Sequence, residues 1–159
     1  MLLLDVTAFG IPQRAGVEAS RMPPCSGTRV PTTALPTQLR ALFPWSHLNP
    51  MQSECYEAAF LSDASLIVAA PTGSGKTGVL SLALARLWAL NEHPRATAIY
   101  VAPLKALVNE RFLDWSTKCA GLGIRCVQLT GDDEDASEEH SVASADLILT
   151  TPEKWDSFT

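Results

Sequence analysis

Apolar and polar positions in this chain follow two periods, which alternate from residue 65 onward. Four segments are continuous apolar runs, as is typical of strands buried on both faces of a sheet. These runs cover residues 65–70, 96–103, 124–131 and 145–151. Helical segments separate them, so the pattern predicts an α/β fold with a parallel, doubly wound sheet.

The spacing of apolar residues also predicts where the helices lie. Helices are expected over residues 37–43, 49–62, 75–91, 104–120 and 152–158. Asn49 is a favourable N-cap, and Pro50 fits the first turn of the helix that follows it. The segment from Asp132 to Glu139 is dominated by acidic residues. Their mutual repulsion predicts a solvated loop.

Residues 1–36 differ from the rest of the chain. They hold five of the eleven prolines and show no sustained apolar period. This composition predicts an irregular, disordered leader, followed by a domain over residues 37–159. The apolar start is short and lacks a basic flank, so we expect no secretory signal peptide.

Composition and net charge argue against several classes of protein. Hydrophobic residues make up 47% of the chain, which is enough for a core, and the formal net charge is −5. This charge argues against a generally basic nucleic-acid binder, although local contacts remain possible. No apolar run approaches the length of a membrane span. The four cysteines lack CxxC spacing, which favours reduced intracellular thiols over a metal site.

The stretch "APTGSGKT", residues 70–77, joins a predicted strand to a predicted helix. It matches the Walker A spacing, with Ala70 in place of the first glycine. Glycines let such a loop turn its N–H groups toward phosphates, a lysine adds charge, and a threonine hydroxyl is a suitable Mg²⁺ ligand. The pattern therefore predicts a triphosphate site. Its predicted binding residues are Thr72, Gly73, Ser74, Gly75, Lys76 and Thr77, with Thr77 as the metal ligand.

Four motifs occur in a fixed order: "APTGSGKT", "VAPLKALVNER", "LTGD" and "TTPEKWD". In order and spacing they resemble the superfamily-two DExH helicases of the Ski-like branch, and the resemblance extends from Leu35 to Thr159. The flanking stretches "LPTQLRALFP" and "TTPEKWDSFT" are most similar to the meiosis-specific crossover DNA helicases of that branch. Membership implies an incomplete RecA-like P-loop domain, ATP and Mg²⁺ as cofactors, and a nuclear location.

The resemblance also implies roles for individual residues. The segment "FPWSHLNPMQSECY" resembles the Q-motif of the family, in which Gln52 would hydrogen-bond the adenine edge through its amide donor and acceptor. Other matched positions would contact nucleic-acid phosphates, largely through backbone amides. These are Pro103, Leu104, Lys105, Thr130, Gly131, Thr151, Pro152 and Glu153.

The helix over residues 104–120 has a second predicted role, in packing. We expect Ala106, Leu107, Phe112 and Trp115 to pack on the sheet. Arg111 lies on a different face, where it would pair with acidic neighbours.

ATP hydrolysis needs a carboxylate pair directly after an apolar strand. The family supplies this pair as its DExH motif, which would follow "TTPEKWD" and is absent from the sequence. Asp133 and Glu134 fall in the acidic loop, and Asp146 precedes its strand, so neither position fits. We therefore expect these 159 residues to bind ATP without hydrolysing it alone.

In this interpretation the chain is part of a DNA helicase motor whose partners are single-stranded or branched DNA and the remainder of the helicase, with no membrane. The residues leave two alternatives open. One is part of a related RNA helicase, and the other is a stand-alone, non-enzymatic nucleotide- or nucleic-acid-binding module.

Overall fold

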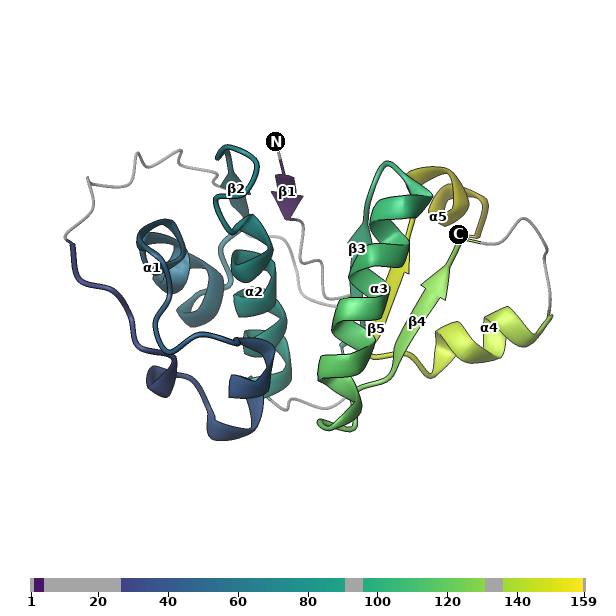
Figure 1. The fold of residues 1–159 in the computed structure, drawn as a ribbon. Coiled ribbons are helices and arrows are strands. Elements are labelled where there is room, and N and C mark those ends of the chain that lie inside the picture. The colour runs from purple at the N-terminus through teal and green to yellow at the C-terminus, as the bar shows by residue number, and fades with distance from the viewer. Residues whose placement is uncertain (1, 5–26, 91–95, 131–135, 159) are drawn as a thin grey trace. The chain divides into compact units, whose positions relative to one another are not determined.

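The computed structural model describes residues 2–4, 27–90, 96–130 and 136–158. The chain forms two compact units, Met1–Asn91 and Glu92–Thr159. Figure 1 shows the helices and strands of both units.

The first unit carries helices around a short strand pair. Its strands are β1 (Leu2–Leu4) and β2 (Leu66–Val68), which pair antiparallel. Its helical elements are the 3-10 segments η1 (Thr32–Ala34) and η2 (Thr37–Leu42), α1 (Pro50–Tyr56), the π-helical η3 (Glu57–Leu61) and α2 (Lys76–Leu90). The predicted helices over 49–62 and 75–91 are confirmed, whereas residues 37–42 form a 3-10 helix and not an α-helix.

Apolar side chains from η2, α1 and α2 form the core of the first unit. Buried residues of this core include Leu39, Leu42, Leu48, Cys55, Val79, Leu82 and Ala85. Part of the predicted leader also packs here. Leu35 is 2% exposed, and the Thr32 hydroxyl donates to the carbonyl oxygens of Trp45 and Ser46. The packed part of the chain therefore begins before residue 36. Residues 5–26 lie outside the described residues, so the domain boundary stays a prediction.

The second unit is a parallel sheet with helices. Its strands are β3 (Ala98–Val101), β4 (Cys126–Leu129) and β5 (Leu147–Thr150), in the order β3-β5-β4. Its helices are α3 (Lys105–Ala120), α4 (Ala136–Ala143) and α5 (Pro152–Phe158). All the pairings of this sheet are parallel. The predicted α/β class with a parallel sheet is confirmed, although the predicted strand at 65–70 pairs instead with β1.

Helices cover both faces of this sheet. On one face α3 lies along the strands (Figure 1), and the Trp115 ring meets the Tyr100 ring edge-on with centroids 5.2 Å apart. On the other face, Trp155 and Phe158 of α5 pack against a cluster around Ile148. Every residue of β5 is buried, so the prediction that continuous apolar runs form strands buried on both faces is confirmed for the central strand.

Two predictions about the second unit need correction. Val108, Trp115 and Cys119 are the buried residues of α3, whereas Ala106 and Leu107 are exposed. The buried residues repeat at helical spacing along one stripe, and positions 106 and 107 fall outside it. The predicted acidic loop is also partly helical, because α4 begins at Ala136. Acidic residues early in a helix are compatible with the positive end of its dipole.

The described cysteines Cys55, Cys119 and Cys126 are free thiols. Cys119 lies in the last turn of α3 and Cys126 begins β4, and their side chains share a hydrogen bond. This hydrogen bond and burial raise the pKa of Cys119, while the bond from Cys119 lowers the pKa of Cys126. Among the described residues, no helix is long and apolar enough to cross a membrane, and no cluster of three potential metal ligands of the His, Cys, Asp or Glu type occurs.

Candidate functional site

The loop between β2 and α2 takes the shape that the Walker A spacing predicts. Gly73 and Gly75 have φ values of +81° and +90°. Residues with a Cβ rarely adopt this left-handed region, so glycine is required at both positions. At residue 76 the chain enters α2, whose N-terminal N–H groups therefore adjoin the loop.

Lys76 folds back over the loop that precedes it. Its Nζ donates to the carbonyl oxygens of Ala70 and Pro71, at 2.6 and 2.7 Å. The positive charge is therefore held beside the backbone of the loop and at the positive end of α2. This arrangement gathers the local electrostatic features that favour a bound polyphosphate.

The hydroxyl-bearing residues of the loop differ in their surroundings. Thr72 is exposed, whereas Ser74 and Thr77 are half-buried. The Ser74 Oγ is fully covered and has no hydrogen-bond partner among the described residues. Thr77 lies in the first turn of α2, one residue after Lys76. Its hydroxyl is an oxygen donor that Mg²⁺ accepts, so this residue fits one ligand position of a nucleotide-bound metal.

Gln52 is buried against the phosphate loop, with only 1% of its surface exposed. Its Oε1 accepts a hydrogen bond from the Asn49 N–H at 3.0 Å, and its Nε2 donates to the Gly75 carbonyl at 2.9 Å. The structure therefore brings Gln52 to the loop, as a residue that binds the loop backbone through the same amide group expected to contact adenine. The adenine contact stays a prediction.

Asn49 also reaches the loop, a contact that the sequence reasoning did not anticipate. Its Oδ1 caps α1 by accepting from the Gln52 N–H, as predicted, and its Nδ2 donates to the Ser74 carbonyl at 2.9 Å. The N-cap pattern predicts the first of these bonds. No local signal predicts the second, because it joins positions that are 25 residues apart.

The second unit brings most of the predicted nucleic-acid-binding positions to one edge of its sheet. Val101, Thr150 and Leu129 are register partners at the carboxyl ends of the three parallel strands. The predicted positions follow these strand ends directly: residues 103–105 after β3, Thr130 after β4, and residues 151–153 after β5. Gly131 lies outside the described residues.

These positions differ in exposure. Pro103, Leu104 and Lys105 are exposed, as are Pro152 and Glu153, whereas Thr130 is half-buried and Thr151 is 4% exposed. Leu104 is the N-cap of α3 and has extended backbone angles, so the helix begins at Lys105, one residue after the predicted start. Hydrogen bonds hold the edge together: the Thr150 hydroxyl donates to the Leu129 carbonyl, and the Gln128 amide donates to the Thr130 hydroxyl.

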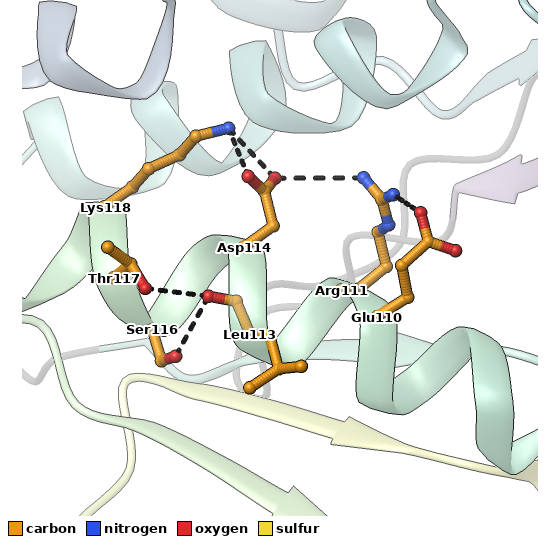
Figure 2. A network of polar contacts seen from close by, with 7 residues as sticks. All are labelled: Glu110, Arg111, Leu113, Asp114, Ser116, Thr117 and Lys118. Atoms are coloured by element: carbon orange, nitrogen blue, oxygen red, sulfur yellow. Dashed lines mark hydrogen bonds and ion pairs between the residues drawn. The ribbon is translucent and has the colours of Figure 1, made fainter.

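Arg111 belongs to an ion-pair network on α3, shown in Figure 2. Its guanidinium pairs with Glu110 and, at 3.8 Å, with Asp114, which also binds Lys118 at 2.8 Å. The predicted pairing of Arg111 with acidic neighbours is confirmed.

Asp146 lies at the amino end of β5, opposite the edge just described. Its carboxylate accepts a hydrogen bond from the Arg125 N–H at 2.8 Å. This structural role agrees with its exclusion as a catalytic carboxylate. Asp133 and Glu134 lie outside the described residues.

The sequence model of the family "DEAD/DEAH box helicase" matches residues 49–159. The chain is 46% identical over 132 residues to the ATP-dependent DNA helicase MER3 homolog of Oryza sativa subsp. japonica, covering 77% of this chain and 11% of that protein. It is 44% identical over 129 residues to human activating signal cointegrator 1 complex subunit 3, covering 80% of this chain and 6% of that protein. The chain thus spans a small part of both relatives.

Among solved structures, the chain is similar to the DUF1998 helicase MrfA bound to DNA and AMPPNP. The TM-score is 0.66 at 21% sequence identity, covering 79% of this chain and 18% of MrfA. At this level of identity the similarity concerns the fold alone.

Proposed function

Because the chain belongs to the DEAD/DEAH box helicase family, we propose that it binds ATP with Mg²⁺ as part of the motor domain of a DNA helicase. One observation carries this proposal: the loop over residues 70–77 has two glycines at positive φ and a lysine ammonium held beside its backbone. Such a loop at the start of a helix offers N–H donors and positive charge to a polyphosphate.

In this proposal Lys76 contacts the terminal phosphates, while Gly73 and Gly75 present backbone N–H groups to them. The Ser74 N–H, which donates to the Pro71 carbonyl at 3.3 Å in the structure, would have to turn to join them. Thr77 contributes its hydroxyl to a Mg²⁺ ion that arrives with the nucleotide. The metal would neutralise phosphate charge during hydrolysis. The carboxylates that would complete a hydrolytic site have no candidate in the described residues, so these residues alone bind ATP without turning it over.

The carboxyl edge of the parallel sheet is the proposed nucleic-acid contact. Residues 103–105, 130–131 and 151–153 match the strand-binding motifs of the helicase branch that the sequence resembles. Backbone amides and Lys105 would contact phosphates, which gives affinity without base specificity. The similarity to a DNA helicase of rice supports single-stranded or branched DNA as the substrate of the whole protein.

A role in meiotic recombination, and with it a nuclear location, is the finer part of the proposal. It is supported by the identity to a MER3 homolog of rice and by a second one, from Arabidopsis thaliana, at 41% over 131 residues.

The proposal is tested by measuring ATP binding to the full-length protein and to its Lys76→Ala variant. Loss of the lysine removes a charged donor to the phosphates, and we expect ATP affinity to fall about a hundredfold, which corresponds to roughly 2.7 kcal/mol. Unchanged affinity would exclude the loop as the nucleotide site. Stimulation of ATPase activity by DNA and by RNA, measured side by side, then separates a DNA helicase from the RNA alternative.

A further inference from the structure

Two side-chain amides join the start of α1 to the phosphate loop, and we propose that this pair, Asn49 and Gln52, sets the shape of the loop for phosphate independently of the base. The inference rests on the proposed ATP site. It assigns both residues as positioning residues, which act on the phosphates through the loop backbone.

Each amide uses its two ends for different partners. The oxygen ends form the capping box of α1: Asn49 Oδ1 accepts from the Gln52 N–H and Gln52 Oε1 accepts from the Asn49 N–H. The nitrogen ends leave the helix and donate to consecutive loop carbonyls, Ser74 and Gly75, both at 2.9 Å. The cap fixes both amides, so their nitrogen ends reach the loop already oriented.

Holding these two carbonyls fixes the direction of two donors. In a planar trans peptide the C=O and the following N–H point to opposite sides. The Ser74 carbonyl turned toward Asn49 therefore turns the Gly75 N–H away from α1, and the Gly75 carbonyl does the same for the Lys76 N–H. These are N–H groups of the glycine-rich turn, which such loops direct at phosphates. Asn49 and Gln52 thus help to orient donors that they do not contact, and the Gly75 carbonyl also accepts from the Gly78 N–H at 2.9 Å.

Gly78 gives an independent sign that the position of Gln52 matters. Gly78 lies inside α2, where its φ is not positive and where glycine is about 1 kcal/mol less favourable than alanine. A Cβ at this position would lie 2.2 Å from Gln52 Nε2 and 2.8 Å from Gln52 Cδ. A Cβ at residue 78 would therefore displace the Gln52 amide, whereas the backbone conformation there would accept other residues.

The test separates loop shaping from base reading. Binding of ATP and of inorganic tripolyphosphate, which has no base, is measured on the full-length protein and on Asn49→Ser, Gln52→Met and Gly78→Ala. Serine preserves the N-cap of α1 but is too short to reach the Ser74 carbonyl. Alanine at 78 favours the helix yet displaces the Gln52 amide. Ser62→Ala, which loses a hydrogen bond to the Ala58 carbonyl away from the loop, is the matched control.

We expect each of the three variants to bind ATP and tripolyphosphate about tenfold more weakly than the unsubstituted parent protein, by the same factor for both ligands. The melting temperatures of Asn49→Ser and Ser62→Ala should stay close to that of the parent protein. Ser62→Ala should bind both ligands as the parent does. Loss of ATP affinity with retained tripolyphosphate affinity in Gln52→Met would assign Gln52 to the base and overturn the inference. Unchanged affinity in Asn49→Ser and Gly78→Ala would also overturn it. A parent protein that binds neither ligand would instead contradict the proposed function.

Discussion

The phosphate loop and the carboxyl edge of the parallel sheet are held in place by different means. The loop depends on a few polar bonds from Asn49 and Gln52 and on glycines with no alternative at their positions. The sheet edge depends on strand pairing and on side chains packed against both faces. Single substitutions should therefore act on binding at the loop and on folding stability at the sheet.

The largest effect is expected in the packing of the sheet. Trp115 is 1% exposed and meets Tyr100 edge-on, so Trp115→Ala should lower the free energy of unfolding by about 3–5 kcal/mol. Chemical denaturation monitored by circular dichroism would measure the loss. Trp115→Phe is the control, because it keeps a ring and removes an indole N–H that has no partner in the described structure. A loss as large in the phenylalanine variant would contradict a packing role.

The second-largest effect is expected from a substitution that distorts the phosphate loop. Gly75→Ala forces a side chain into the left-handed region, at a cost of about 1–2 kcal/mol, and places a Cβ 2.7 Å from the amide nitrogens of both Asn49 and Gln52. We expect a clear loss of ATP affinity with only a small decrease in melting temperature. Isothermal titration calorimetry would measure the affinity, and a thermal melt would measure the stability. Gly121→Ala is the comparison, since a Cβ at Gly121 meets nothing within 4 Å.

A smaller effect is expected at the strand ends. Thr150 is fully buried, and its hydroxyl donates to the Leu129 carbonyl at 2.8 Å. Thr150→Val keeps the shape and removes this donor, so the free energy of unfolding should fall by about 1 kcal/mol. Urea titration would measure it. A loss above that of Trp115→Ala would mean that polar bonds, and not packing, dominate the sheet edge.

The smallest effect concerns the ion pairs on α3 in Figure 2. Asp114 pairs with Arg111 and Lys118, and all three side chains are partly exposed to solvent. Asp114→Ala should cost about 0.5 kcal/mol, and the cost should shrink further at high salt because solvent and ions screen such pairs. Thermal melts at low and high ionic strength would detect it. A cost independent of salt would point to lost packing instead.

The sequence predicted those parts of the molecule that local patterns determine. Caps and apolar periods placed α2, α3 and the continuous segment formed by α1 and η3 within one residue at each end, and the glycine spacing identified the loop. The sequence does not indicate α4, because the like charges over residues 132–139 are typical of a solvated loop, whereas the helix begins at Ala136. The 3-10 geometry of η2 and the wider π turns of η3 depend on packing, which a local pattern does not contain.

The candidate site shows the same division between local and distant signals. Lys76 and its neighbours could be identified from spacing, because consecutive residues build the loop. The contacts of Asn49 and Gln52 with residues 74 and 75 could not, because they span more than 20 positions and arise only when α1 packs beside α2. The sequence therefore predicts the residues of the loop, but it does not predict the hydrogen bonds from Asn49 and Gln52 that hold the loop in place.

Gly78 carries a consequence for the design of variants. A methyl group there would collide with a side chain 26 positions earlier in the chain, so the residue allowed at position 78 depends on the residue chosen at position 52. A library that varies position 78 alone would find that alanine weakens phosphate binding, because its methyl group displaces the Gln52 amide. With a shorter residue at 52 the steric conflict with alanine at 78 would disappear, although the hydrogen bond from Gln52 to the Gly75 carbonyl would be lost as well. In an engineered version of this domain, the two positions would have to be chosen together.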